Sequence, residues 1–362
     1  MTTHEESSSV AGKTATWNFP LTVSVSLGNP TLSFAPPVAA QPAIAQPAAM
    51  AASSVPVATV GKQPAVVFAT DDEPTADDIK QAREAVERAS TRTDYYDTEK
   101  DQADRTAYYS GISATLSPAQ LFDALSNLVT STHKNKLGYK PMVHLYPWVD
   151  LQPSRKIKSV YSSQTFNPIE LIERDQEVAR MREERITRFR TTESAESPAA
   201  MATFLEAMEA QLAFNCEHVV PQSWFNKRQP MKGDLHHLFA CESGCNSFRS
   251  NTPYFDFSDF NEAVRSDCGK SDTNKFEPTA GKGPVARATL YFLLRYPGEI
   301  NATSNEYTAD RLQVLLNWHK DNPVTEYERH RNQAIFEVQG NRNPLVDEPE
   351  WGTQINFRRG LG

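Results

Sequence analysis

The feature that most constrains this chain of 362 residues is one short polar stretch, which runs from Asn215 to Phe257. It contains an adjacent Glu217–His218 pair, a cluster of Asp234, His236 and His237, and an Asn246 that is followed by Arg249. The spacing of these side chains suits a single site for metal-assisted hydrolysis of a phosphodiester.

Hydrolysis of a phosphodiester requires a specific set of groups. A base must deprotonate water, a hard divalent ion must hold phosphate oxygens, and cations must neutralise the charge that develops. A histidine that is neutral near pH 7 can be the base. A carboxylate and an amide oxygen are suitable ligands for Mg²⁺, which keeps several waters.

The adjacency of Glu217 and His218 constrains the local backbone. Neighbouring residues on a strand point to opposite faces, so the two side chains share one site only if the strand bends or ends there. Pro221 supports such an ending. Residues 246–250 can begin a helix after Gly244, which predicts a strand-strand-helix arrangement with Asn246 packed against the strands.

Several sequence blocks around this stretch resemble the endonuclease I family of bacterial periplasmic and secreted nucleases, which belongs to the His-Me finger (ββα-metal) superfamily. The resemblance covers roughly residues 105–350, and the order of the blocks makes it specific. The blocks are EHVVPQSW at 217–224, DLHHLF at 234–239, CNSFRSN at 245–251, FEP at 276–278, KGPVARATLYFLLRY at 282–296, LNWHKDNPVTEYERHRNQAIFEVQGNRNPLVDEP at 316–349 and, more weakly, YYSGIS at 108–113 and VYSSQ at 160–164.

The resemblance implies a role for each residue of the central motif. It implies that His218 is the general base, that Glu217 and Asn246 hold the divalent ion, and that the products carry 5′-phosphate and 3′-hydroxyl ends. The implied ion is Mg²⁺ or another divalent cation such as Mn²⁺ or Ca²⁺. Arg249 follows Asn246 by about one helical turn and is a candidate phosphate clamp.

Further basic residues are candidates for contacts with the nucleic-acid backbone. The loop at 226–233 carries Lys227, Arg228 and Lys232, and among these Arg228 and Lys232 are the candidate substrate-binding residues. Arg287, in the predicted helix 285–296, either faces phosphate or pairs with a carboxylate.

Each of these residues also has a structural interpretation. Asp234, His236 and His237 are expected to support the site from behind, because one histidine can bond Asp234 or backbone and hold the motif. The NRNP sequence at 341–344 is typical of a turn. For Glu217, His218 and Asn246 the alternative is a buried polar network without catalysis.

The cysteines Cys216, Cys241, Cys245 and Cys268 all lie in the catalytic region. Two disulfides would suit an exported nuclease, with Cys241 bridged to Cys245 and Cys216 left to Cys268. A structural zinc site and free thiols are the alternatives, although a C-x₃-C spacing is a weak zinc signature.

Composition limits the classes of protein that fit this chain. Hydrophobic content of 39% and charged content of 23% are typical of a globular protein and exclude a collagen-like or wholly disordered chain. No apolar run is long enough to cross a bilayer. The formal charge of −8 argues against coating nucleic acid by bulk positive charge, but it allows a local basic groove.

The sequence divides into segments of different character. Residues 1–34 include an alternating pattern at 14–27 that predicts a strand, and residues 35–70 form an Ala- and Pro-rich linker. Residues 71–104 are acidic, and Thr75 with Asp78 predicts the start of a charged helix with Lys80/Glu84 and Arg83/Glu87 pairs. The catalytic domain then covers residues 105–352, and 353–362 is a tail.

The expected fold of the catalytic domain is α+β, with several helices around a small antiparallel sheet and a ββα-metal finger. Helices are predicted at 116–129, 167–190, 198–213 and 285–296, and a short strand is predicted at 157–161. For the first of these helices, Ser117 is the expected N-cap and Pro118 occupies the first helical position.

The leading functional hypothesis is a metal-dependent, largely sequence-nonspecific endonuclease that hydrolyses DNA and possibly RNA. The same nuclease acting as a delivered toxin or defence effector, addressed by its N-terminal segment and controlled by a partner or inhibitor protein, is the alternative. A non-catalytic nucleic-acid-binding protein is disfavoured by the intact motif. The resemblance implies export to the periplasm or medium, whereas the N-terminal residues lack the pattern of a Sec signal, and no membrane association is expected.

Overall fold

The computed structural model describes residues 75–191, 214–262 and 267–362. Every described residue belongs to a single compact unit. The strand expected at 14–27, the linker at 35–70 and the helix expected at 198–213 therefore lie outside the described residues.

Helix α1 (Ala76–Thr91) opens the described part of the chain with a capping box between Thr75 and Asp78, as the sequence predicts. Its buried Ala82 and Ala89 belong to a hydrophobic cluster with the short helix η1 (Leu145–Val149). Lys80 pairs with Glu84, but Arg83 contacts Glu173 on helix α5 (Pro168–Thr191) instead of Glu87. Helix α1 is therefore packed into the catalytic region, and not only solvent-facing.

The next helices frame one side of the molecule. Helix α2 (Thr98–Tyr108) is followed by α3 (Pro118–Thr132), which has Ser117 as its N-cap and Leu121, Phe122 and Leu125 buried on one face. Short helices α4 (Pro141–His144) and η1 (Leu145–Val149) follow. The expected strand at 157–161 is only β1 (Ile157–Lys158), which pairs with β2 (Thr165–Phe166).

The central motif folds as a hairpin followed by a helix. Strand β3 (Phe214–His218) is antiparallel to β4 (Leu238–Glu242), with Glu217 opposite Phe239 and His218 opposite Leu238. The connection contains the short 3₁₀ turns η2 (Gln222–Phe225), η3 (Met231–Gly233) and η4 (Leu235–His237). Helix α7 (Ser243–Arg249) then packs on both strands, which confirms the predicted strand-strand-helix order.

The remaining elements complete the described chain. A second hairpin joins β5 (Gly269–Asp272) to β6 (Lys275–Pro278). The helices that follow are α8 (Lys282–Arg295), α9 (Ala309–Asp321), α10 (Glu326–Gln339), α11 (Pro344–Asp347), η5 (Pro349–Thr353) and η6 (Phe357–Gly360). Helix α8 lies between α3, α9 and η4, and nearly all of its side chains are buried.

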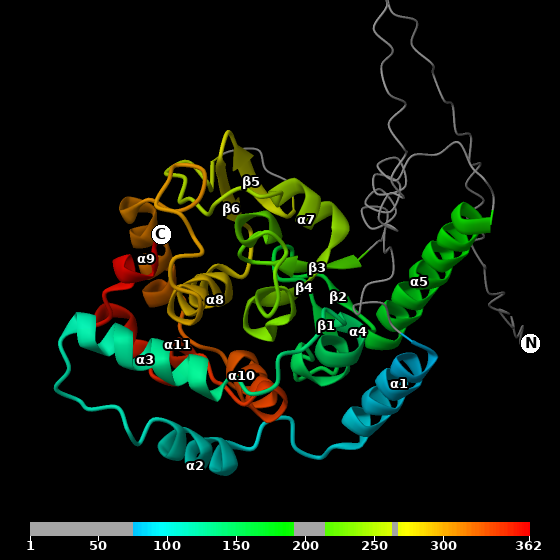
Figure 1. Cartoon of the computed structure of the whole chain (residues 1–362), viewed down its shortest axis with the longest axis horizontal. Helices are drawn as coiled ribbons and strands as arrows, with labels where there is room; N and C mark the ends of the chain where they lie inside the picture. The colour runs from blue at the N-terminus through cyan, green and yellow to red at the C-terminus, as the bar shows by residue number, and fades with distance from the viewer. Residues whose placement is uncertain (1–74, 192–213, 263–266) are drawn as a thin grey trace, which may run out of the picture. The chain divides into compact units, whose positions relative to one another are not determined.

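The architecture is α+β, as expected, with helices surrounding two-stranded antiparallel sheets (Figure 1). The tail at 353–362 is not loose, because Phe357 is buried and Gly362 N–H donates to the Ile300 carbonyl. No helix in the described ranges is both long and apolar enough to span a membrane.

Candidate active site

The hairpin of β3 and β4 positions the Glu217–His218 pair at the end of β3. His218 is the last residue of the strand, and Pro221 follows as the residue that precedes the 3₁₀ turn η2. Helix α7 brings Asn246 to the same place, because the Asn246 Nδ2 donates to the Cys216 carbonyl at 3.3 Å. The three residues of the predicted metal-and-base set are therefore neighbours in space.

Glu217 lies almost completely buried, with 1% of its surface exposed. Its Oε1 accepts from the Tyr161 hydroxyl at 2.9 Å and from the Arg249 guanidinium at 2.7 Å. Burial raises the pKa of the Glu217 carboxyl to about 7, against the opposing effects of Arg249 and the Tyr161 hydrogen bond. The site thus holds a carboxyl group whose charge depends on a nearby cation.

Arg249 is held inside the protein rather than presented to a substrate. Besides Glu217, its guanidinium donates to the backbone carbonyls of His218 at 3.1 Å and Val219 at 2.8 Å, and it lies 5.1 Å from the Tyr254 ring. These contacts fix the end of β3 against α7. The placement favours a positioning role for Arg249 over the direct phosphate contact that its sequence spacing suggests.

The His218 ring is oriented by two hydrogen bonds. The Lys232 carbonyl can only accept, so the Nε2–H of His218 donates to it at 2.9 Å. The Nδ1 atom therefore carries the lone pair, and it accepts from the Gln222 amide at 3.1 Å. Burial, together with nearby His237, lowers the pKa of His218 well below its ordinary value, so the ring is neutral near pH 7.

Two oxygen atoms at the site have no hydrogen bond within the described residues. They are Oε2 of Glu217 and Oδ1 of Asn246, since the other polar atom of each side chain makes the contacts given above. One anionic and one neutral oxygen are the ligand types that Mg²⁺, Mn²⁺ or Ca²⁺ accepts, with water completing the shell. No group of three or more His, Cys, Asp or Glu side chains in the described ranges is placed to hold a metal.

Asp234, His236 and His237 lie behind the catalytic pair, buried beneath it. Asp234 accepts from the Tyr291 and Tyr296 hydroxyls, both at 2.9 Å. His237 donates from Nε2 to the Met231 carbonyl at 2.6 Å, and its ring lies 5.4 Å from that of His218. The supporting role expected for all three residues stays a prediction.

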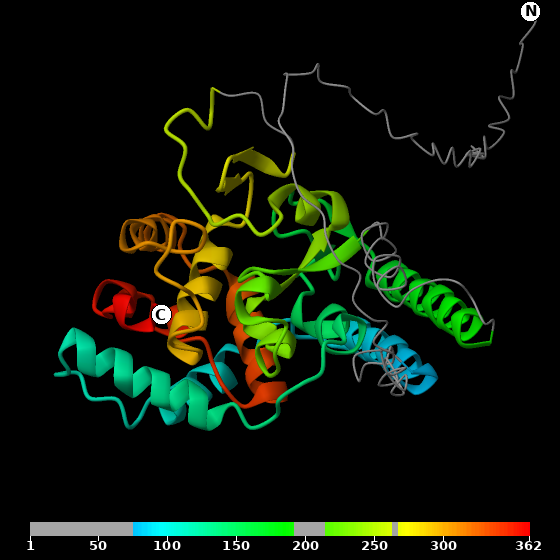
Figure 2. The ribbon, with the colours of Figure 1, turned by 45° about the horizontal axis from the view of Figure 1, so that its top comes forward.

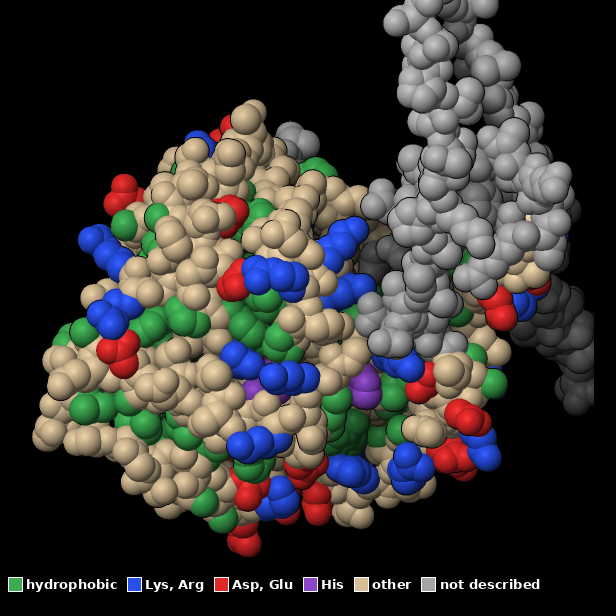
Figure 3. All heavy atoms as spheres, in the orientation of Figure 1, with side chains coloured by type: hydrophobic (Ala, Val, Ile, Leu, Met, Phe, Trp, Pro, Cys, Tyr) green, Lys and Arg blue, Asp and Glu red, His purple; other side chains and the backbone are tan. Residues whose placement is uncertain are grey.

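The basic loop at 226–233 runs beside the pair, and its residues differ in what they contact. Arg228 forms an ion pair with Glu299, and its side chain remains half exposed. Lys232 holds His218 through its backbone carbonyl, while its ammonium lies 5.4 Å from the Tyr139 ring. Figure 3 shows lysine and arginine side chains gathered over the middle of one face, close to histidine side chains.

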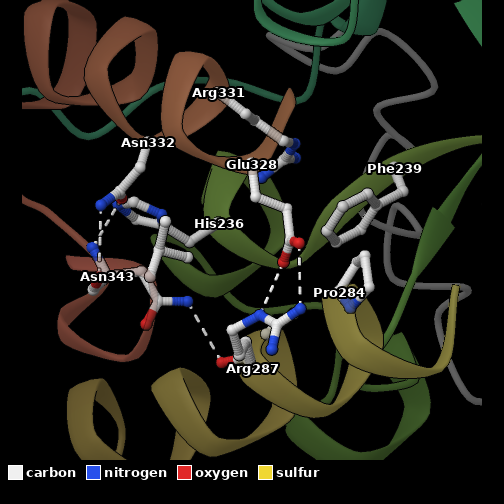
Figure 4. Close-up of a pocket in the computed structure, with 10 residues that line it drawn as sticks. His236, Phe239, Pro284, Arg287, Glu328, Arg331, Asn332 and Asn343 are labelled. Carbon is white, nitrogen blue, oxygen red and sulfur yellow. Dashed lines mark hydrogen bonds and ion pairs between the residues drawn. The ribbon is translucent and has the colours of Figure 1, made fainter. Parts of the chain in front are cut away.

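Arg287 does not face the catalytic pair. It is buried in a pocket lined by residues of α8, α10 and the β4 region, where its Nε and NH2 donate to the Glu328 carboxylate at 2.6 and 2.9 Å (Figure 4). Of the two interpretations, pairing with a carboxylate is therefore the one that the structure supports. His236 lines the same pocket and donates to the Asn341 carbonyl at 3.2 Å.

The expected disulfide pairing is wrong. A disulfide joins Cys245, at the start of α7, to Cys268, directly before β5. Cys216 and Cys241 are buried and take no part in it. Cys241 lies opposite Asn215 in the hairpin, so Cys216, one position along, points to the other face and cannot bridge to it.

Sequence reasoning missed several side chains of the site. Tyr161 bonds Glu217 and also lies 2.7 Å from the Tyr254 hydroxyl, so that both tyrosines support the carboxylate. The VYSSQ block contains Tyr161 and was the available signal. Gln222 lies in the EHVVPQSW block, but the sequence did not predict its contact with Nδ1 of His218.

Comparison with known proteins places this site in a family. The model of the family described as Endonuclease I matches residues 119–350, which is more than half of the chain. An extracellular ribonuclease of Bacillus subtilis is 35% identical over 157 residues, covering 39% of this chain and 54% of that protein. An extracellular deoxyribonuclease of Aeromonas hydrophila is 31% identical over 126 residues, covering 33% of this chain and 50% of that protein.

A periplasmic deoxyribonuclease of Aeromonas hydrophila is 30% identical over 132 residues, covering 34% of this chain and 50% of that protein. The chain thus spans about half the length of the curated relatives that it matches. The Glu217, His218 and Asn246 constellation lies inside the segment that the family model covers. On this match, the chain belongs to the Endonuclease I family.

Proposed function

We propose that this protein is a divalent-metal-dependent, largely sequence-nonspecific endonuclease that hydrolyses DNA, and also RNA, to 5′-phosphate and 3′-hydroxyl ends. The observation that carries the proposal is the state of His218. Its Nε2–H is fixed on the Lys232 carbonyl, which leaves a neutral ring with its lone pair on Nδ1, at the end of the strand whose backbone Asn246 contacts at Cys216. Family membership and the names of the relatives support nucleic acid as the substrate.

In the proposed reaction, a water molecule displaces the Gln222 amide from Nδ1 of His218, Nδ1 takes a proton from that water, and the water oxygen attacks phosphorus. The bond between phosphorus and the 3′ oxygen breaks, and the 3′ oxygen takes up a proton from solvent water to become the 3′-hydroxyl. The phosphate stays on the 5′ end of the downstream fragment. Glu217 Oε2 and Asn246 Oδ1 would hold the divalent ion, which supplies positive charge to phosphate and leaving oxygens. Arg249 and Tyr161 hold Glu217 in place.

Sequence-nonspecific action follows from what the site offers. The loop beside His218 carries Lys227, Arg228 and Lys232, and basic side chains of this kind contact phosphate and do not discriminate between bases. The relatives' names include both ribonucleases and deoxyribonucleases, which supports action on both polymers. Export is supported by relatives named extracellular or periplasmic and by the Cys245–Cys268 disulfide.

The test is cleavage of plasmid DNA and of RNA by the full chain with Mg²⁺, with EDTA, and with the His218→Ala variant. We expect Mg²⁺-dependent nicking and linearisation, and a loss of about 100-fold or more in His218→Ala. His144→Ala is the matched control, because His144 ends α4 and takes no part in the proposed chemistry. Wild-type cleavage by His218→Ala would disprove the base assignment.

Metal binding has its own test. Asn246→Ala should raise the Mg²⁺ concentration needed for half-maximal cleavage, because one of the two open oxygens is lost. End-labelling of the products then checks which side retains the phosphate. Products with 3′-phosphate ends would contradict the proposed bond cleavage.

A further inference from the structure

We propose that a surface beside the catalytic hairpin binds the unpaired bases of single-stranded nucleic acid. This aromatic strip consists of Phe248, Phe255 and Phe257 with Lys270 and Lys275. The inference rests on the proposed nuclease function and names the form of substrate that the site prefers. A strand whose bases are unpaired can stack them on aromatic rings, whereas a duplex offers only its backbone and groove edges.

The outer side of the β5–β6 hairpin region exposes the rings of the strip. Phe248 on α7 is 39% exposed, and Phe255 and Phe257 are half-buried with their rings 5.0 Å apart, edge to face. Apart from Phe248, the described residues contain only Met181 as a large exposed hydrophobic side chain. A surface phenylalanine beside a catalytic motif is therefore a distinguishing feature of this molecule.

The lysines of the strip lie over its rings. The Lys275 ammonium is 4.4 Å from the Phe255 ring centroid, and that of Lys270 is 4.6 Å from the Phe257 centroid. Contacts of this type are weak at exposed positions, and a stacked base contributes more than they do. A bound strand can therefore displace the Lys275 ammonium from its ring, and this ammonium can then meet a phosphate of the same strand.

The charge balance of this region favours single strands over duplexes. Lys270 pairs with Asp259, and Lys282 pairs with Glu277 and lies 3.9 Å from Asp256. The region therefore has little net positive charge with which to attract a duplex by its phosphates. Stacking on aromatic faces is the interaction that remains, and it requires unpaired bases.

The strip is firmly attached to the catalytic residues. Tyr254 and Phe276 are aromatic residues of the same region whose rings are fully buried. The centroid of the Tyr161 ring lies 5.0 Å from that of Phe276. Phe255 N–H donates to the Phe276 carbonyl at 2.9 Å, which fixes the segment along β6. Because Tyr161 bonds Glu217, the strip and the catalytic carboxylate share one rigid aromatic support.

A covalent link joins the same two elements. The Cys245–Cys268 disulfide ties α7, which carries Asn246 and Phe248, to the start of β5. Both ribbon views show α7 beside the β5–β6 hairpin (Figures 1 and 2). A strand that runs from the catalytic pair over α7 would therefore reach the strip directly.

The experiment measures binding of the full chain in EDTA, where the proposed cleavage does not proceed. Labelled probes of equal length are a single-stranded DNA, the same sequence as RNA, the same sequence as duplex DNA, and an abasic strand that keeps the backbone but lacks bases. We expect the wild type to bind the base-bearing single strands at least about tenfold more tightly than the abasic strand.

The matched variants keep hydrophobic volume but remove the flat ring face. Phe255→Leu/Phe257→Leu should lose about tenfold in affinity for the single strands, with duplex affinity changed less than about twofold. Phe336→Leu is the control, because Phe336 is also half-buried beside a cation, Arg342, but lies on α10. Thermal melting of each variant verifies that it is folded.

The outcomes separate this inference from the proposed function. Equal binding of base-bearing and abasic strands by the wild type would contradict the proposal that the aromatic strip binds unpaired bases, even if the double variant fails to fold. An equal loss of single-strand and duplex affinity in the double variant also overturns it. If the protein does not cleave in Mg²⁺ but still binds base-bearing strands more tightly than abasic ones, the nuclease proposal is rejected. Base binding by the aromatic strip would still be supported.

Discussion

At the scale of single residues, the Glu217–Arg249 pair decides how the carboxylate is presented. Both side chains are 1% exposed, and the carboxylate and guanidinium are 2.7 Å apart. Removing Arg249 leaves a buried carboxyl without its partner and the carbonyls of His218 and Val219 without their donor, so Arg249→Met should lower the free energy of unfolding by about 3–5 kcal/mol. Urea denaturation followed by circular dichroism measures this change.

The control for this prediction is the double variant Glu217→Gln/Arg249→Met, in which neither charge remains. It should recover much of the lost stability while remaining inactive, because the proposed metal ligand is gone. If Arg249→Met kept wild-type stability and only raised KM, then Arg249 would contact phosphate directly and its buried contacts would not matter.

Gln222 supports a second residue-scale prediction. Its amide donates to Nδ1 of His218 and helps to hold the ring in the orientation that the base requires. Loss of one such hydrogen bond corresponds to about 1 kcal/mol, so Gln222→Leu should reduce kcat by roughly fivefold with little change in KM. Ser223→Ala, at the exposed neighbouring position, is the control in steady-state assays. An unchanged kcat would contradict a positioning role for Gln222.

The motif residues show what sequence can and cannot predict at this scale. The spacing of Glu217, His218 and Asn246 predicted a strand pair with a helix packed against it, and Asn246 does contact the backbone of β3 at Cys216. The shared site of the three side chains stays a prediction. The partners of Arg249 and Arg287 were not predictable, because sequence position does not tell whether a guanidinium faces outward or is buried against a distant carboxylate. Glu328 is the partner of Arg287 only because α10 packs beside α8.

At the scale of elements, helix starts were predictable where their signals are local. The caps at Thr75 and Ser117 depend on residues three positions apart, and both helices begin as expected. Pairing between distant segments has no such signal. The disulfide partner of Cys245 depends on how β5 lies against α7, and therefore the pairing inferred from spacing was wrong.

This disulfide leads to a prediction about α7, which is only a short helix. The bridge closes a loop with a sequence separation of 23, so its loss in Cys245→Ser/Cys268→Ser should cost about 3 kcal/mol of stability. Nuclease activity should fall with it, because Asn246 follows Cys245 directly. Melting temperature and cleavage rate are measured with and without dithiothreitol.

Dithiothreitol should affect the wild type and have no further effect on the double variant, which serves as its own control. Cys216 and Cys241 are buried, and burial raises the pKa of both thiols well above the ordinary value, so neither is expected to react in the folded state. A wild type indifferent to reductant under conditions that reduce the bond would contradict a role for it in holding α7.

At the scale of the whole molecule, the described chain is organised around buried polar groups as much as around apolar ones. Helix α1 and Asp101 of α2 lie outside the segment that the family model matches, yet Ala82 joins a core cluster and Asp101 pairs with Arg342. The acidic character of residues 71–104 suggested a separate segment, because composition does not show which acidic side chains find a buried partner.

The buried groups under the active site predict how stability depends on pH. Burial lowers the pKa of His236 to about 4, although Asp234 opposes the shift and Arg331 adds to it. Between about pH 6.5 and 4 the unfolded chain binds a proton at this histidine and the folded chain does not. The free energy of unfolding must therefore fall as pH falls through this range.

Asp234 acts in the same direction at lower pH. Although burial opposes it, the neighbouring His133, His236 and His237 and the hydrogen bond from Gln339 hold the pKa of this carboxyl below its ordinary value. Its contribution is present above the unfolded pKa of about 4 and is lost as pH falls through the folded value.

His236→Gln separates these contributions, because it removes one titrating group and keeps a side-chain amide that can donate to the Asn341 carbonyl. Between pH 6.5 and 5 the wild type should lose up to about 2 kcal/mol more unfolding free energy than the variant. Between pH 7 and 8 the two should change in parallel, since His236 is neutral there in both states. Urea unfolding at each pH measures the difference, and identical slopes below pH 6.5 would mean that His236 is not held neutral in the fold.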